Sequence, residues 1–186
     1  MNLAHALVCS SPWWAGTVER KLVPWGLAGV ELGDERLEIG PGFGATTRVL
    51  ARTPGPLTVV ELSEAYCKRL RRKLGDEVAV VRADATAMPF ADHSFSGVAC
   101  FTMLHHVPSS EQQDRLLAEV SRVLRPGGVF AGTDSLGTGA LFKVLHVRDT
   151  LVPVAPGELP ARLERAGLTG PRVLVGWRPF LGTGRV

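Results

Sequence analysis

Three glycines in a short turn, and one acid that follows them, have the clearest chemical meaning in this sequence. The glycines are Gly40, Gly42 and Gly44, and the acid is Glu61, 21 residues after Gly40. Glycine lets the backbone turn tightly and approach a ligand closely, with the amide groups of a starting helix facing that ligand. A carboxylate at the end of the next strand can accept hydrogen bonds from both hydroxyls of a ribose. The pattern therefore predicts a binding site for a nucleoside.

Two other interpretations of these residues stay open. The spacing Gly40-x-Gly42-x-x-Ala45 also satisfies a loosened dinucleotide fingerprint, which indicates an NAD(P)-dependent oxidoreductase. Against it, the Tyr-x-x-x-Lys pair of the short-chain dehydrogenases is missing, because the single tyrosine, Tyr66, is followed four residues later by Leu70. The third interpretation is a non-catalytic protein that binds an adenosyl ligand.

The adjacent histidines His105 and His106 are the second candidate for chemistry. They follow an apolar run that we expect to be a strand, which places them at the carboxyl edge of a sheet. A neutral imidazole can take the proton of a reacting hydroxyl or amine, although local packing explains the pair equally well. Adjacent side chains point apart, and no Cys, His or carboxylate cluster near them completes a metal shell, so we expect no metal. Asp134 is interpreted as an isolated acid.

The elements that must position these residues are those of an α/β fold. From residue 36 onward, short apolar runs alternate with segments of helical period, which predicts a Rossmann-like, mostly parallel sheet with helices on both faces. We expect the last two strands to form a hairpin, so that the seven-stranded sheet has an antiparallel edge strand. The expected strands are Leu37–Ile39, Leu57–Leu62, Val78–Arg82, Val98–Phe101, Val129–Thr133, Arg172–Val175 and Phe180–Gly182.

Capping residues mark two of the expected helices. Ser63 is expected to cap a helix that ends at Gly75, a residue that tolerates a left-handed C-terminal turn. Ser110, with Gln113 three residues later, has the spacing of a capping box. A third helix is expected over residues 159–166.

Composition and charge exclude several classes of protein. The chain has 186 residues, of which 45% are hydrophobic and 21% charged, as in average soluble proteins. No apolar run reaches the length of a membrane-spanning helix, and the first basic residue, Arg20, comes too late for a secretory leader. The net charge of +3 is small and the basic run Lys68–Lys73 is typical of a solvated helix face, so we expect no nucleic-acid partner. Three scattered cysteines fit free thiols in the cytoplasm.

Five motifs in order resemble those of the class I S-adenosylmethionine-dependent methyltransferases. The resemblance is to the broad group, methyltransferase type 11, that includes the ubiquinone and menaquinone biosynthesis methyltransferases, and it covers about residues 36 to 135. The motifs are Glu38–Gly44, Glu61, Ala83–Phe90, Phe101–Val107 and Leu124–Gly128. Ser96 departs from the pattern, because many relatives have an Asp there.

The resemblance implies an enzyme that transfers a methyl group from S-adenosylmethionine to a small-molecule acceptor. It implies that Glu38 orients the turn and the cofactor's amino group, and that Asp84 accepts from the adenine amino group, although a loop Asp also commonly caps nearby backbone. His105 and His106 become candidates for the catalytic base, with His106 favoured because relatives carry a His in this segment. The implied cofactor-binding residues are Glu38, Gly40, Pro41, Gly42, Gly44, Glu61, Leu62, Asp84, Ala85 and Phe101.

The remaining segments are expected to form the acceptor side of a single domain. We expect an N-terminal helical cap over residues 1–35, a cofactor-binding core over 36–135, and an acceptor-side segment with the last strands over 136–186. The first 30 residues, which carry Trp13, Trp14 and Trp25, are interpreted either as a cover for the acceptor or as a helix packed on the sheet. The tryptophans favour an apolar or aromatic acceptor. The sequence indicates no oligomeric state.

Overall fold

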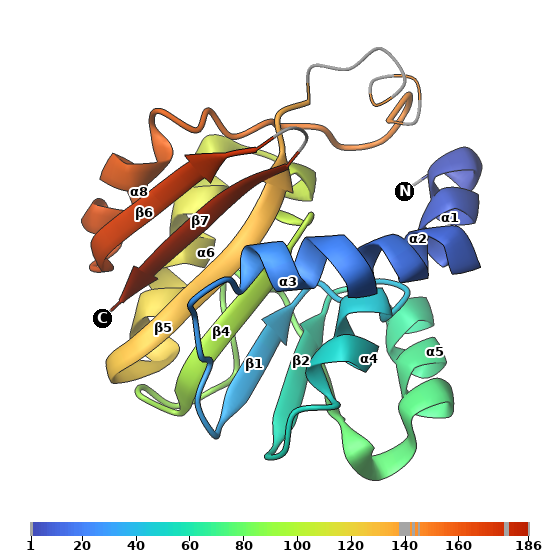
Figure 1. The fold of residues 1–186 in the computed structure, drawn as a ribbon, viewed down its shortest axis with the longest axis horizontal. Coiled ribbons are helices and arrows are strands. Elements are labelled where there is room, and N and C mark those ends of the chain that lie inside the picture. The colour runs from blue at the N-terminus through green and yellow to red at the C-terminus, as the bar shows by residue number, and fades with distance from the viewer. Residues whose placement is uncertain (1, 138–141, 143, 145, 177–178, 186) are drawn as a thin grey trace.

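The sheet at the centre of the computed structural model contains all the strands of the chain that the structure describes, which covers residues 2–137, 142, 144, 146–176 and 179–185 (Figure 1). The strand order is β3-β2-β1-β4-β5-β7-β6. β1, β2, β3, β4 and β5 pair in parallel, and β7 pairs antiparallel with both β5 and β6. The strands are β1 (Arg36–Ile39), β2 (Leu57–Glu61), β3 (Ala79–Arg82), β4 (Phe95–Phe101), β5 (Leu124–Ser135), β6 (Thr169–Val175) and β7 (Pro179–Arg185).

This architecture confirms the predicted Rossmann-like α/β fold with a mostly parallel sheet. The predicted place of the antiparallel strand is wrong, because β7 lies between β5 and β6 and the edge strand is β6. The connection from β5 through a helix brings β6 back parallel to β5, and β7 then returns antiparallel into the position between them. The two last strands still form the expected antiparallel pair.

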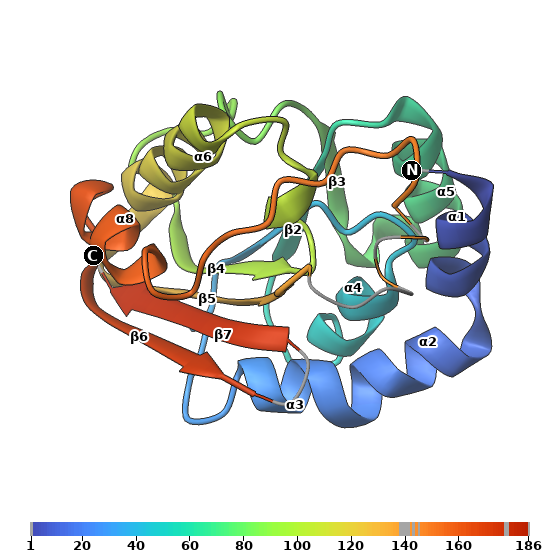
Figure 2. The same cartoon turned by 90° about the horizontal axis from the view of Figure 1, so that it is seen from above.

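Helices cover both faces of the sheet, as Figure 2 shows from above. On one face, α6 (Ser110–Val123) and α8 (Leu159–Arg165) pack into a core that includes the fully buried Leu117 and Leu163. On the other face, five helical segments cover a core that they form together with the strands. They are α2 (Pro12–Thr17), a π-helical turn (Val18–Leu22), α3 (Val23–Gly26), α4 (Ala45–Leu50) and α5 (Glu64–Leu74). Further helical segments are α1 (Leu3–Ser10) and short 3-10 turns at Gly75–Glu77 and Leu104–His106.

The N-terminal helices divide into two parts with different surroundings. Val18, Leu22 and Val23 are buried against the sheet, so this part of the chain is core, as one of the two interpretations of the sequence had it. α1 lies apart from that core, on the carboxyl side of the strands, and Leu3 and Leu7 on it are exposed (Figure 1). Within the described residues, no helix combines the length and apolar composition that crossing a membrane requires.

One of the predicted helix caps is displaced by a residue. Ser63 caps α5 as expected, with Gly75 at its end. α6 is capped by Ser109 rather than Ser110, because the Ser109 hydroxyl accepts from the Gln112 amide at 3.3 Å. Gln113 is buried, and its side-chain amide donates to the carbonyls of residues 104 and 152 at 3.1 and 2.8 Å instead of closing a capping box.

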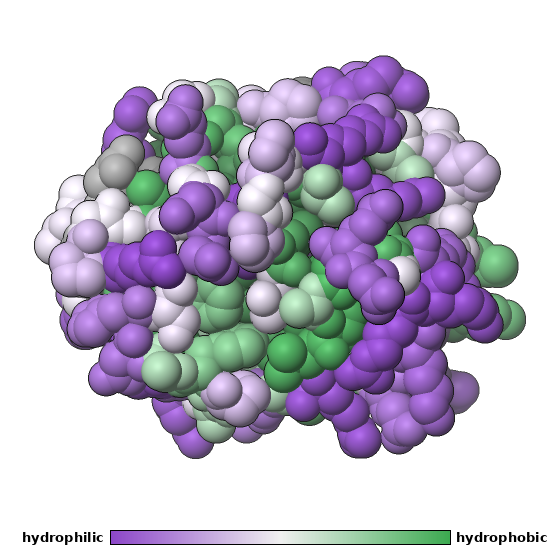
Figure 3. Space-filling view, turned by 90° about the horizontal axis from the view of Figure 1, so that it is seen from below, coloured by the Kyte–Doolittle hydropathy of each residue, from purple (hydrophilic) through white to green (hydrophobic). Residues whose placement is uncertain are grey.

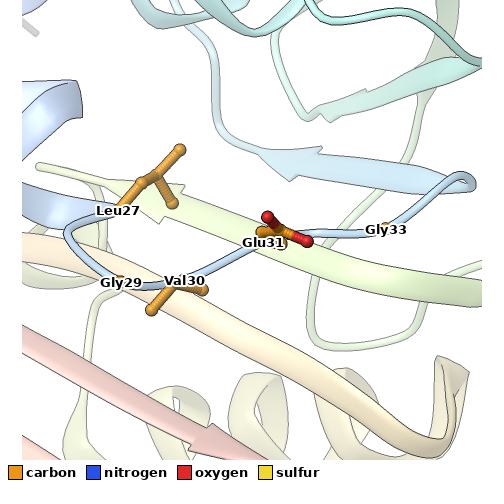
Figure 4. A pocket seen from close by; sticks show the side chains of 5 residues that line it. All are labelled: Leu27, Gly29, Val30, Glu31 and Gly33. Atoms are coloured by element: carbon orange, nitrogen blue, oxygen red, sulfur yellow. The ribbon is translucent and has the colours of Figure 1, made fainter.

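An open hollow of about 610 Å³ lies far from the glycine turn. Its walls come from the loop between α3 and β1, which leads to the amino end of β1 (Figure 4). The lining residues are Leu27, Gly29, Val30, Glu31 and Gly33. The face that carries the amino ends of the strands is mostly hydrophilic, with apolar surface gathered near its middle (Figure 3). Because parallel sheets place their ligands at the carboxyl ends of strands, the candidate site is sought there instead.

Candidate functional site

The three glycines of the turn between β1 and α4 face different surroundings. All three have positive φ, at 63° for Gly40, 52° for Gly42 and 76° for Gly44. A side chain at Gly44 would lie 2.7 Å from the Leu70 methyl of α5, and one at Gly40 would collide with Met103, so both are required by packing. A side chain at Gly42 would meet no described atom within 4 Å. Of the three, Gly42 is therefore the one whose backbone faces open space.

Glu61, at the end of β2, is brought directly against this turn. The Gly42 amide donates to Glu61 Oε2 at 3.1 Å, and the Ser63 amide donates to Oε1 at 2.8 Å. Only 8% of Glu61 is exposed. The acid thus fixes the turn while each oxygen keeps a further lone pair for a ligand.

Glu38, below the turn in β1, is a carboxylate in an apolar setting. It is 1% exposed, and the Thr46 hydroxyl donates to its Oε1. Burial raises the pKa of Glu38 to about 7, with the Thr46 hydrogen bond acting in the opposite direction. Its Oε2 is buried without a hydrogen-bond partner among the described residues. A buried carboxylate oxygen without a partner is costly, which marks this atom as available to a ligand's donor.

The other predicted cofactor-binding residues are only partly gathered around the turn. Leu62 follows Glu61 directly and is 66% exposed. Asp84 is exposed, and its Oδ1 accepts from the Thr86 amide at 2.8 Å, as a loop Asp that caps nearby backbone does. Phe101 is buried, and its ring packs against Gly26 of α3, so its side chain belongs to the core. Pro41 is buried within the turn and Ala85 is half-buried beyond β3.

Ser96, the residue that departs from the expected pattern, holds the loop that enters β1. Its hydroxyl oxygen accepts from the Glu35 amide at 2.9 Å and lies 3.0 Å from the Leu32 carbonyl oxygen. The departure therefore concerns the amino end of β4, away from the glycine turn.

His105 and Asp134 form a buried pair at the ends of the neighbouring strands β4 and β5. The Nδ1 of His105 hydrogen-bonds Asp134 Oδ1, and the His105 amide donates to Oδ2 at 2.9 Å. His105 is 2% exposed and Asp134 is 3% exposed. The prediction that Asp134 is an isolated acid was wrong, because adjacent parallel strands bring their ends together although the residues are far apart in sequence. A carboxylate on Nδ1 fixes the tautomer that leaves Nε2 as the basic atom.

His106 lies in a group of histidines that the sequence analysis missed. Its Nδ1 is 3.2 Å from the Thr150 carbonyl oxygen, and its ring centroid lies 5.3 Å from those of both His5 and His146. Burial, followed by the neighbouring His105, lowers the pKa of His106 to about 3. His5 comes from α1 and His146 from the segment after β5. No spacing in the sequence signals this group, because its members lie on three separate segments.

Comparisons with known proteins agree with this geometry. The profile of the family described as "Methyltransferase domain" matches residues 37–132. A sterol 24-C-methyltransferase of Eremothecium gossypii is 38% identical over 56% of this chain and 29% of its own length. The ubiquinone/menaquinone biosynthesis C-methyltransferase UbiE of Hahella chejuensis is 35% identical over 54% of this chain and 43% of its own. The chain thus spans less than half the length of either relative.

Solved structures show the same fold. An S-adenosylmethionine-dependent methyltransferase from Mesorhizobium loti superposes on this chain with a TM-score of 0.74 and a sequence identity of 18%. The superposition includes 89% of this chain and 99% of the Mesorhizobium loti chain. At this sequence identity the similarity shows the fold alone. The family match lies on the segment that carries the glycine turn, Glu61 and the two adjacent histidines.

Proposed function

Because this chain belongs to the class I S-adenosylmethionine-dependent methyltransferases, we propose that it transfers a methyl group from that cofactor to a small apolar or aromatic acceptor. The observation that carries the proposal is the contact between Gly42, whose backbone faces open space, and the carboxylate of Glu61. Together they provide a place for close approach of a ligand and an acceptor for ribose hydroxyls.

The residues around the turn fit the cofactor. Gly40, Pro41, Gly42 and Gly44 form the turn, and Glu38 offers a buried oxygen without a partner to the cofactor's amino group. Glu61 would accept from the ribose, the exposed Leu62 would cover the adenine, and the loop at Asp84 and Ala85 would meet its edge. Phe101 would contribute through its backbone alone, since its ring lies in the core. When bound, the cofactor supplies a methyl group already activated on a sulfonium, so positioning contributes much of the rate.

The acceptor side is proposed to lie over the ends of β4 and β5. His105, held by Asp134, would take the proton of a hydroxyl or amine acceptor, and this contact favours His105 over His106 as the base. The Asn2 side chain donates to the Val147 carbonyl at 2.8 Å and so joins α1 to the segment after β5. Leu7, Val144 and Val147 on these two segments are exposed apolar side chains, which supports an apolar acceptor. The relatives named above carry the names of sterol and quinone methyltransferases.

Calorimetric titration tests the cofactor. We expect S-adenosylmethionine and S-adenosylhomocysteine to bind, and NAD and NADP not to bind. Binding of the nicotinamide cofactors without the adenosyl ligands would overturn the proposal. Transfer of label from methyl-labelled cofactor to small-molecule extracts then separates an enzyme from a non-catalytic protein that binds the same ligand.

Replacing Glu61 by Ala should weaken S-adenosylhomocysteine binding at least about tenfold, and it should also loosen the turn. The same carboxylate holds the Gly42 and Ser63 amides, and hydrogen bonds to charged groups contribute roughly 1.5–3 kcal/mol. We therefore expect the free energy of unfolding to fall by a similar amount, measured by urea denaturation beside the titration. An unchanged affinity in the folded variant would return Glu61 to a purely structural role.

Gly42→Ala should abolish cofactor binding at a modest cost in stability. Gly29→Ala is a matched control, because Gly29 also has positive φ, at 72°, and also faces open space among the described residues. Each substitution should cost about 1–2 kcal/mol of unfolding free energy, since an L side chain is strained in this conformation. Only the methyl at residue 42 occupies the space beside Glu61. Equal loss of S-adenosylhomocysteine affinity in both variants would show that strain, and not the cofactor site, is responsible.

Glu38 should make the stability of the protein depend on pH. Its pKa is about 7 in the folded chain and 4.5 in the unfolded chain, so the folded state holds a proton that the unfolded state has lost between these values. Its contribution to stability is fully present below pH 4.5 and is lost as the pH rises through 7. Glu38→Gln mimics the neutral acid and should gain about 3 kcal/mol over the natural protein between pH 5 and pH 8. If the difference in unfolding free energy between Glu38→Gln and the natural protein is the same at pH 5 and at pH 8, the expectation is refuted.

A further inference from the structure

Three histidines from distant parts of the chain meet at the carboxyl side of the sheet. His5 lies on α1, His106 on the 3-10 turn after β4, and His146 on the segment after β5, which passes beside α1 in both views (Figures 1 and 2). One ring nitrogen from each lies within 4.8 Å of the others. A small inward movement would bring them to the spacing of ligands around a single transition-metal ion.

The Nδ1 atom of each histidine already has an acceptor within hydrogen-bond distance. Nδ1 of His5 is 3.1 Å from Asp149 Oδ2, Nδ1 of His106 is 3.2 Å from the Thr150 carbonyl oxygen, and Nδ1 of His146 is 2.7 Å from the Phe142 carbonyl oxygen. In each neutral ring the proton therefore lies on Nδ1, and Nε2 keeps its lone pair. Histidines that ligate a metal are oriented in this way, with the other ring nitrogen donating to a carboxylate or a backbone carbonyl.

Packing alone does not account for this group. His146 is 5% exposed, and its Nε2 is buried with no hydrogen-bond partner among the described residues. A buried polar atom without a partner costs about 1–3 kcal/mol, and an apolar residue in its place would avoid that cost.

We propose that His5, His106 and His146 form a binding site for a divalent transition metal of the zinc class, ligated by their three Nε2 atoms. Three imidazoles suit zinc, and three protein ligands leave a fourth position open to solvent or to an oxygen of a bound molecule. His105 stays outside the ligand set, because the ring nitrogens that lie within 4.8 Å of one another are those of His5, His106 and His146. Asp149 acts behind the site, where it orients His5. The site does not depend on the cofactor, so it can be tested without one.

The test is metal binding by the full chain, with Zn²⁺ alone as calorimetric probe and Co²⁺ alone as spectroscopic probe. We expect one ion per chain and a visible Co²⁺ spectrum of a four- or five-coordinate site. His5→Asn, His106→Asn and His146→Asn should each abolish stoichiometric binding. An asparagine amide reaches the position of Nδ1 and can keep its hydrogen bond, but it lacks the Nε2 ligand. Asp149→Asn removes only an outer partner and should weaken Zn²⁺ binding by roughly 10- to 100-fold.

His93→Asn is the matched control, because His93 also holds a backbone carbonyl through Nδ1, at 2.9 Å from the Leu124 oxygen, and lies outside the group. Its positive φ of 58° is one that asparagine tolerates. We expect this variant to bind Zn²⁺ as the natural protein does. Circular dichroism of each variant separates loss of the ion from loss of the fold. Absence of stoichiometric Zn²⁺ binding in the natural protein, or binding that survives in the three folded variants, would overturn the proposal.

Discussion

We expect removal of residues 1–25 to abolish the cooperative unfolding transition and removal of residues 1–10 to keep it. The longer truncation deletes Val18, Leu22 and Val23, which are 1%, 7% and 4% exposed and cover Phe101 and Ala131 of the sheet. Burying one such side chain stabilises a fold by about 1.5–3 kcal/mol. Three of them, with the sheet surface that they cover, amount to much of the roughly 5–15 kcal/mol that keeps a domain folded.

The shorter truncation is the control within the same experiment. It removes α1, where Leu3 and Leu7 are 77% and 63% exposed and only His5 is buried. We expect urea denaturation followed by circular dichroism to give one sigmoidal transition for residues 11–186 and none for residues 26–186. A cooperative transition in the longer truncation would mean that the helices over residues 12–26 are a dispensable cover, as the other interpretation of this segment holds. Loss of cooperativity in both would place α1 in the core.

The parts of the fold and site that the sequence predicted are those fixed by short stretches of backbone. A strand, a glycine turn and a helix follow one another within a few residues, so the position of Gly42 could be inferred from its neighbours alone. Glu61 could be added because β1 and β2 are parallel neighbours, and their ends therefore meet. The order of β7 and β6 in the sheet could not be predicted, because a hairpin pattern does not indicate which of its two strands pairs with β5.

The proposed acceptor side was much less predictable, because its contacts join segments that no periodic pattern connects. Asp134 meets His105 only through the pairing of β4 with β5, and His146 lies in a segment without helical or strand period. The local interpretation of Gln113 failed for the same reason, since a buried amide finds its carbonyl partners across the fold. Functional residues that such long-range contacts bring together can be identified only in the structure. The pair of His105 and Asp134 is the clearest example.

Asp134→Asn should lower methyl transfer to an acceptor that must lose a proton by about 10² to 10⁴, with S-adenosylhomocysteine affinity nearly unchanged. Asp134 accepts from Nδ1 of His105 and from its backbone amide, and so fixes both the tautomer and the position of the ring. Asparagine keeps the shape of the side chain, but one of its two polar groups is an NH₂ donor. When this NH₂ group faces Nδ1 of His105, it favours the tautomer with the proton on Nε2, and the ring can then no longer act as the base. His105→Asn should lower the rate to a similar extent.

The control is Asp114→Asn. Asp114 lies on α6, where its carboxylate accepts from Nε of Arg162 on α8 at 2.6 Å. The effect of this substitution should appear in the free energy of unfolding and not in turnover. Single-turnover rates with an acceptor found by label transfer decide between the roles. If both variants turn over at the rate of the natural protein, positioning alone carries the reaction and the pair of His105 and Asp134 is structural.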